Sequence, residues 1–396
     1  MTDQNRARNV QAQRRATTPA ADFTIRFYQA GDEGLINAFY NDPSQRPGAG
    51  VCGVPARTNS EWIWEFASHN QDSGIPYSLA FDQERLVGIQ GFLPIQLIHD
   101  GRVELSEKSE DTLVSPEYRG KGLLDQMYRM LFERALQRGV VVQWGFTSTA
   151  VKPLIRSGFK SLGKVDFYRL NLSARAVAAS ILRHTSPGLP RAEAFANAVL
   201  RFPQIIRSSG VSLIRRFFPR PMPPGMEVVE LTKLDEVCDQ FSARFSRAYP
   251  GISVHFSGSY LHWRCFKNPY FRYRVYAANH GGEMVGLAVF KIDDRSRMGI
   301  VSALAAIPTE TQGASIVLNA LLETGLRVFA RHGCRSAVAW CFWSHAFSNL
   351  VRDSLKKVGF FNFAADTDFM VRAVTSNDPS YLNPNNWFIC EIMSER

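Results

Sequence analysis

The chain has 396 residues, of which 45% are hydrophobic and 12% aromatic, so it is long enough to fold into two domains. No apolar run reaches the roughly 18 residues of a membrane-spanning helix, which argues against an integral membrane protein of the helical kind. The net charge of +10 lies in residues 1–21, with four Arg and one Asp, and in residues 173–225, with eight Arg and one Glu. No specific nucleic-acid partner is expected, because such a partner requires basic residues on a folded face.

The N-terminal residues and the cysteines indicate in which compartment of the cell the protein is expected. Residues 1–21 carry Arg without an apolar core, which excludes a secretory signal and predicts a disordered basic tail. The cysteines, which show no paired or metal-ligand spacing, are Cys52, Cys238, Cys265, Cys334, Cys341 and Cys390. Unpaired thiols predict a reducing compartment, so we expect a cytoplasmic protein without a metal site.

Residues 22–172 alternate between strand and helix patterns. Apolar alternation predicts strands at Phe23–Tyr28, Tyr77–Phe81, Leu86–Ile98, a segment ending at Thr112–Val114, Val140–Phe146 and 165–172. Helical periodicity predicts helices at 32–41, 59–69, 122–138 and 150–157. This order predicts an α/β (α+β) domain.

Residues 173–225 mix Arg with Leu, Ile, Phe and Pro, which predicts a basic linker with helical segments. A cationic helix with an apolar face can lie on an anionic membrane surface, which would place the protein at the inner face of the membrane. The same helix can pack between two domains with its Arg side chains exposed. The sequence leaves both interpretations open.

Three short markers repeat at a period near 199 residues. Trp64 corresponds to Trp263, Val87-Gly88 to Val285-Gly286, and Gly158-Phe159 to Gly359-Phe360. Markers that recur in one order at one spacing indicate two copies of one α/β module. We therefore expect a second domain over 226–396, each domain having its own hydrophobic core.

The most informative segment is Arg119-Gly120-Lys121-Gly122-Leu123-Leu124, which joins a predicted strand to a predicted helix. The first N–H groups of a helix have no internal partner and can bind an anion. The two glycines let the backbone approach a ligand, and Arg119 and Lys121 add positive charge. The segment predicts a diphosphate-binding turn, and a solvated turn without a ligand is the alternative.

This turn resembles motif A of the GNAT acyltransferase superfamily, Gln/Arg-x-x-Gly-x-Gly/Ala. Arg119 and Gly122 match the motif, whereas Leu124 stands where the family has Gly or Ala. The resemblance implies a mixed, mainly antiparallel sheet that splays apart in its middle. It also implies acetyl-CoA or another acyl-CoA in the split, with its diphosphate held by residues 119–124, and no metal.

The resemblance further implies roles for the strand before the turn. The backbone of Leu113 and Val114 would pair with the pantetheine amides, and the N–H of Val114 would stabilise the oxyanion. A carboxylate on this strand would act as general base through water, with Asp111 favoured and Glu110 second. A strand-edge carboxylate that bonds to a neighbouring loop is an equal alternative. Strict alternation along the strand places Glu110 and Asp111 on opposite faces.

Two positions depart from the family pattern. Leu154 stands where the family has the Tyr that protonates the departing thiolate, so Thr147, Ser148, Tyr168 or water would have to replace it. In the second copy, alignment of Pro308 with Pro116 leaves no Arg at the motif position. We therefore expect residues 226–396 to form a degenerate GNAT-like domain.

The whole arrangement is similar to tandem-GNAT proteins that accompany bacterial polysaccharide-biosynthesis genes, through Asp111-Thr112, the turn and the closing Asn385–Phe388. This resemblance implies a coenzyme A-dependent N-acyltransferase, and more narrowly an N-acetyltransferase, with a small-molecule amine acceptor such as an amino sugar. Fem-type aminoacyl transfer to a cell-wall precursor is one alternative, which would need no diphosphate turn. A non-catalytic acyl-CoA-binding or assembly protein is the other.

Overall fold

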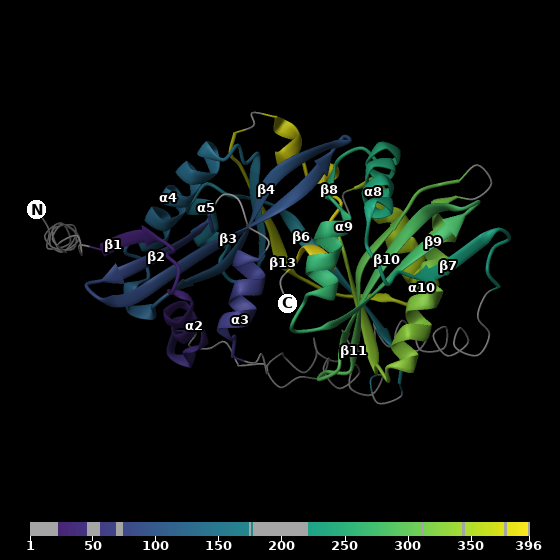
Figure 1. The fold of residues 1–396 in the computed structure, drawn as a ribbon, viewed down its shortest axis with the longest axis horizontal. Helices are drawn as coiled ribbons and strands as arrows, with labels where there is room; N and C mark the ends of the chain where they lie inside the picture. The colour runs from purple at the N-terminus through teal and green to yellow at the C-terminus, as the bar shows by residue number, and fades with distance from the viewer. Residues whose placement is uncertain are drawn as a thin grey trace, which may run out of the picture.

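The structure is a computed structural model that describes residues 23–45, 56–68, 74–173, 176, 221–309, 313–342, 345–375 and 378–394. The predicted tail at 1–21 and nearly all of the predicted linker at 173–225 lie outside the described residues. Figure 1 shows the two halves of the chain side by side.

The first half runs from β1 to β6. Its strands are β1 (Phe23–Phe27), β2 (Tyr77–Asp82), β3 (Arg85–His99), β4 (Arg102–Val114), β5 (Val142–Thr147) and β6 (Lys160–Asn171). Its helices are α2 (Glu33–Asn41), α3 (Asn59–Trp62), the π-helical η2 (Ile63–Ala67), α4 (Leu123–Gln137) and α5 (Val151–Arg156), with 3-10 turns η1 (Pro43–Gln45) and η3 (Pro116–Tyr118). The helix predicted over 59–69 is therefore an α-helical turn followed by a π-helical one.

The second half has the same order of main elements. Its strands are β7 (Met226–Glu230), β8 (Ile252–Val254), β9 (Arg272–His280), β10 (Glu283–Asp293), β11 (Met298–Ala306), β12 (Ser336–Cys341) and β13 (Phe361–Ala373). Its helices are α8 (Glu236–Ala248), α9 (Gly258–Leu261), the π-helical η4 (His262–Phe266), α10 (Ala314–Arg331) and α11 (Ala346–Lys357). The 3-10 turns η5 (Pro379–Leu382), η6 (Pro384–Asn386) and η7 (Glu391–Met393) follow β13.

The described strands form one continuous sheet, and the last strand of each half belongs to the other half. The order is β1-β2-β3-β4-β5-β13-β6-β12-β11-β10-β9-β7, and β8 pairs with β3. β13 lies against β5, whereas β6 lies against β12. Among the described strands the β4–β5 and β11–β12 pairs are parallel, so the sheet is mainly antiparallel, as expected.

This exchange of strands produces a main core that both halves share, and two smaller clusters lie beside α4. A single cluster of buried apolar side chains includes Trp144 and Val165 from the first half and Phe369 and Trp387 from the second. The prediction of two independent cores is wrong, because β6 finds both of its neighbours, β13 and β12, in the other half.

The two halves also meet at their π-helices. The indole rings of Trp64 and Trp263 stack with their centroids 5.3 Å apart. The Trp64 indole N–H donates to the Trp263 carbonyl at 3.3 Å, and the Trp263 indole N–H donates to the Trp64 carbonyl at 2.9 Å. Reciprocal contacts between corresponding residues are typical of a two-fold interface.

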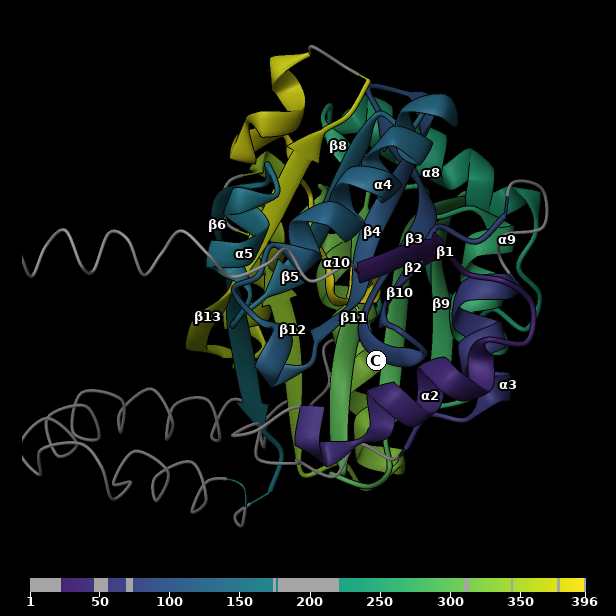
Figure 2. The ribbon, with the colours of Figure 1, turned by 90° about the vertical axis from the view of Figure 1, so that its left-hand side faces the viewer.

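Helices cover both faces of the first half of the sheet (Figure 2). A β-carbon added at Gly88 would meet Met127 and Leu123 of α4, whereas one at Gly91 would meet Tyr77 and Phe66 of the opposite layer. The side chains of β3 and β4 therefore point either toward α4 or toward α2 and η2.

The exchange of β6 and β13 predicts that neither half folds alone. Residues 1–200 and 201–396, expressed as separate chains, should each be insoluble, because each keeps a strand whose partners are missing. Co-expression should give a soluble one-to-one complex, seen by size-exclusion chromatography. A soluble, folded monomer of residues 1–200 would contradict the exchange.

Candidate functional site

The candidate site begins where β4 and β5 separate. The two strands pair in parallel from Ser106 opposite Val142 to Lys108 opposite Trp144. β4 continues to Val114, so its edge from Ser109 onward has no partner in β5. The sheet therefore contains the split that the sequence predicts, and Figure 2 shows β4 and β5 at its two sides.

A β-bulge interrupts β4 within this split. Glu110 pairs with Gly91 of β3 and Leu113 pairs with Ile89, so the single residue between them on β3 faces both Asp111 and Thr112. Asp111 has a positive φ of 50°. The prediction that Glu110 and Asp111 lie on opposite faces is wrong, because the extra residue resets the alternation.

Asp111 is buried in a cluster of polar side chains. Its Oδ2 lies 2.7 Å from Nη2 of Arg57, and the Tyr77 hydroxyl donates to it at 2.8 Å. Arg57 also lies 3.4 Å from Glu65 of η2, and the side chains of Arg57 and Asp111 are fully shielded from solvent. The guanidinium thus balances the buried charge of the Asp111 carboxylate. The base role of Asp111 remains a prediction.

Glu110 has a similar environment on the same face. Its carboxylate forms a buried ion pair with Lys108, two residues earlier on β4. Both candidate bases are thus paired with a cation.

The backbone of Val114 faces the open edge of the split. Ser115 donates its N–H to the carbonyl of Val87 at 2.9 Å, which directs the Ser115 N–H toward β3. Successive residues of a strand direct their backbone groups to opposite edges, so the N–H of Val114 points away from β3 and that of Leu113 toward it. Val114 is placed to donate to a ligand, whereas Leu113 contributes a buried side chain.

The predicted diphosphate turn has the backbone of an anion site. Gly120 and Gly122 have φ values of 78° and 77°, and a β-carbon at either would meet nothing within 4 Å. Glycine is needed here for its left-handed conformation, not for lack of space. The bond from Gln126 N–H to Gly122 carbonyl, at 3.2 Å, is the first within α4. The N–H groups of Leu123 and Leu124 therefore have no helical partner.

The basic side chains of the turn have different surroundings. Arg119 donates to the carbonyls of Val114 at 2.9 Å and of Gln45 at 2.7 Å, so it braces the turn against β4 and η1. The Lys121 ammonium is exposed and lies 4.9 Å from the centre of the Tyr118 ring. Arg119 and Lys121 are both exposed to solvent.

The replacements expected for the missing Tyr do not all lie near the split. Leu154, on α5, is buried beside Tyr128 of α4 and Phe159. Tyr168 lies on β6, which β13 separates from β5, so the expectation that Tyr168 serves the first split is wrong. No pattern in the sequence indicates that β13 lies between β5 and β6.

The corresponding split of the second half is filled by its own chain. β11 and β12 pair from Met298 to Val301 and then separate. Between them, Phe388, Ile389 and Cys390 leave a cavity of about 10 Å³. That volume holds at most one water molecule. Gly313, before α10, has a φ of −72° and does not form the left-handed turn seen at Gly122.

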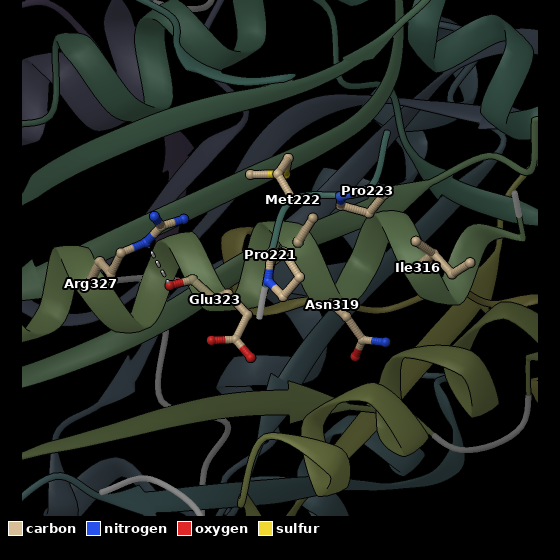
Figure 3. Close-up of a pocket in the computed structure, with 8 residues that line it drawn as sticks. Pro221, Met222, Pro223, Ile316, Asn319, Glu323 and Arg327 are labelled. Atoms are coloured by element: carbon tan, nitrogen blue, oxygen red, sulfur yellow. Dashed lines mark hydrogen bonds between the residues drawn. The ribbon is translucent and has the colours of Figure 1, made fainter. Parts of the chain in front are cut away.

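A larger cavity of about 130 Å³ lies on the outer side of α10 (Figure 3). Pro221, Met222 and Pro223 form one wall, and Ile316, Asn319 and Glu323 of α10 form another. None of the predicted site residues lines it, so we do not assign it to the acyl-transfer site.

The described part of the chain contains no group of three or more His, Cys, Asp or Glu side chains that could hold a metal ion. No helix within it is long and apolar enough to cross a membrane.

The ion pair at the bulge predicts a large loss of stability in Asp111→Asn. This change leaves the Arg57 charge buried without its nearest carboxylate, which should cost about 3 kcal/mol of unfolding free energy. Urea denaturation measures the loss. The control is Glu117→Gln, because the ion pair of Glu117 with Arg85 is exposed and should contribute less than about 1 kcal/mol. Equal stability of Asp111→Asn and the unmodified protein would contradict the assignment.

Comparison with known proteins gives the fold class and the enzyme class. Residues 41–159 match the model of the acetyltransferase (GNAT) domain. A GCN5-related N-acetyltransferase from Anabaena variabilis has a TM-score of 0.54 at 9% identity, with 89% of this chain and 73% of that chain covered. A probable N-acyltransferase from Enterococcus faecalis has a TM-score of 0.55 at 11% identity, with 91% and 73% covered.

The N-myristoyltransferase of Saccharomyces cerevisiae with bound myristoyl-CoA has a TM-score of 0.56 at 11% identity, with 93% of this chain and 90% of that chain covered. No curated protein matches this sequence. The chain has the fold of these transferases, and the domain match together with that fold supports an acyl-CoA-dependent acyltransferase of the GNAT type.

Proposed function

We propose that the protein is a coenzyme A-dependent N-acyltransferase that binds one acyl-CoA in the split between β4 and β5. The observation that carries this proposal is the position of the turn 119–124 at the end of the unpaired edge of β4. Free N–H groups at the start of α4 suit the diphosphate, and the edge at Val114 suits the pantetheine amides. The two left-handed glycines keep side chains away from the path of the ligand.

The acyl group we propose is acetyl. Trp144 pairs with Lys108 at the point where β4 and β5 converge, and it is fully buried. Its ring lies 6.4 Å from that of Phe369 and 6.5 Å from that of Trp387, centroid to centroid. This aromatic cluster fills the floor of the split, so a longer acyl chain would have to displace a large buried side chain.

The acceptor we propose is a primary amine, an amino sugar of a polysaccharide precursor, in keeping with the subgroup that the sequence resembles. We place the enzyme in the cytoplasm, at the inner face of the membrane if residues 173–225 bind anionic lipid. For the base we retain Asp111 acting through water, with Glu110 second. On that assignment, the turnover of Asp111→Asn should fall about 10²-fold with little change in acetyl-CoA affinity.

A non-catalytic acyl-CoA-binding protein is the second candidate. The apolar side chain of Leu154 favours this candidate, because a leucine has no proton to give to a leaving thiolate. Such a protein would bind acetyl-CoA but release no thiol with any amine. The Fem-type alternative has less support, because aminoacyl transfer does not require the diphosphate turn.

The proposal predicts one acetyl-CoA per chain and its loss in Gly122→Asp. The added carboxylate would lie where the diphosphate binds, at a position with a φ of 77°. Isothermal titration calorimetry with acetyl-CoA and myristoyl-CoA measures both the stoichiometry and the preference for the short acyl group. Thiol release with glucosamine as acceptor then separates transferase from binding protein.

Gly139→Asp is the matched control for Gly122→Asp. Gly139 follows the other end of α4, has a φ of 70° and has open space around it, so the variant adds the same charge and the same backbone strain. It should bind acetyl-CoA normally. Two equivalent sites per chain, or unchanged affinity in Gly122→Asp, would refute the proposed location.

A further inference from the structure

A closed ring of hydrogen bonds lies on the α4 side of β4, beside the split. The Tyr128 hydroxyl is 2.9 Å from Oγ of Ser109 and 3.2 Å from Oγ1 of Thr112. The side-chain amide of Gln90 completes the ring, at 3.2 Å from Ser109 and 2.6 Å from Thr112. Four side chains from β3, β4 and α4 thus satisfy one another.

The amide fixes the direction of the ring. Thr112 donates to Oε1 of Gln90, so its oxygen accepts the proton of Tyr128. The Gln90 amide donates to the carbonyls of Gly91 at 2.7 Å and Glu110 at 3.1 Å and contacts Ser109 at 3.2 Å, which leaves the Ser109 hydroxyl proton to donate to the phenol oxygen. Tyr128 therefore donates one hydrogen bond and accepts another, and Ser109 is placed to stabilise a phenolate.

The ring lies between the diphosphate turn and the floor of the split. Ser109 directly follows Lys108, the last residue of β4 that pairs with β5, and Thr112 belongs to the bulge. Both hydroxyl residues are partly exposed, whereas Tyr128 is buried between them. An acyl-CoA bound along the edge of β4, as proposed above, brings its thioester past these hydroxyls.

The phenol is rigid and stays protonated at neutral pH. Its ring packs edge-on against the rings of Phe92 and Phe159, with centroids 5.8 Å and 5.5 Å apart. Burial raises the pKa of Tyr128 to about 12. Leu154, which stands at the family's Tyr position, packs in the same apolar cluster as the ring of Tyr128.

We propose that the Tyr128 hydroxyl is the proton donor to the departing coenzyme A thiolate, an assignment that rests on the proposed acyltransferase function. The amine nitrogen forms its bond to the carbonyl carbon, and the C–S bond breaks with its electron pair on sulfur. The phenol proton passes to sulfur while the phenol oxygen, held by the Ser109 hydroxyl, takes up through water the proton that the amine releases to the base. The products are an amide and coenzyme A.

The test is the pKa of the thiol in the complex with coenzyme A, which needs no acceptor. Thiolate absorbance in the ultraviolet is followed against pH for the unmodified protein and for Tyr128→Phe, which keeps the ring. A phenol that donates to sulfur stabilises the thiolate, so Tyr128→Phe should lower the thiolate fraction about tenfold at a given pH. Its turnover with glucosamine should fall about 10²-fold or more.

Tyr260→Phe is the matched control, because it also removes a buried hydroxyl, one that donates to the Ile392 carbonyl at 3.1 Å in the second half. It should leave the thiol pKa unchanged. Thr112→Val provides a second measurement, since the phenol then loses its resting acceptor and donates to sulfur alone. The thiolate fraction should rise in that variant.

Three outcomes are distinguishable. Failure of the unmodified protein to bind coenzyme A would overturn the proposed function and this assignment with it. Binding with the same thiol pKa in Tyr128→Phe and Thr112→Val would overturn the role of Tyr128 alone. Opposite shifts in these two variants, with none in Tyr260→Phe, would support it.

Discussion

The exchange of β6 and β13 is the constraint on which the rest of the structure depends. Backbone N–H and C=O groups inside a sheet must be paired, and each half obtains that pairing from the last strand of the other. β13 also supplies side chains to the first half. Met370 packs in the cluster that holds Tyr128, and the guanidinium of Arg372 lies 3.6 Å from the centre of the Phe132 ring. The candidate site is therefore built by both halves of the chain.

Within that frame, the bulge at Asp111 shapes the split. A non-glycine residue at positive φ costs conformational energy, and here the buried contact with Arg57 and Tyr77 offsets it. The extra residue turns Asp111 inward and leaves Thr112 facing Tyr128 and Val114 facing the open edge. The one-residue bulge thus places Asp111 in the buried polar cluster with Arg57 and Tyr77. It leaves the hydroxyl of Thr112 and the backbone of Val114 on the side of the split.

The two halves have the same order of strands and helices but differ in the turn before the main helix and in the space between the parallel strands. The turn before α4 has two left-handed glycines, whereas the helix α10 starts from Gly313 in an extended conformation. In the second half, Phe388 and its neighbours fill the space between β11 and β12. These differences explain how one chain can carry a single cofactor site on two similar scaffolds.

The sequence by itself determined the main elements of residues 22–172, the turn at 119–124 and the departures at Leu154 and in the second copy, because periodicity, glycine and helix-start signals are local. Only the tertiary structure decided the partner of each strand, since the pattern of β6 suits β5 and β12 equally well. It alone brought Arg57 to Asp111, 54 positions later, and joined Gln90, Ser109, Thr112 and Tyr128 in one ring. These contacts depend on a bulge and a strand exchange, which are set by long-range packing and leave no periodic signal in the sequence.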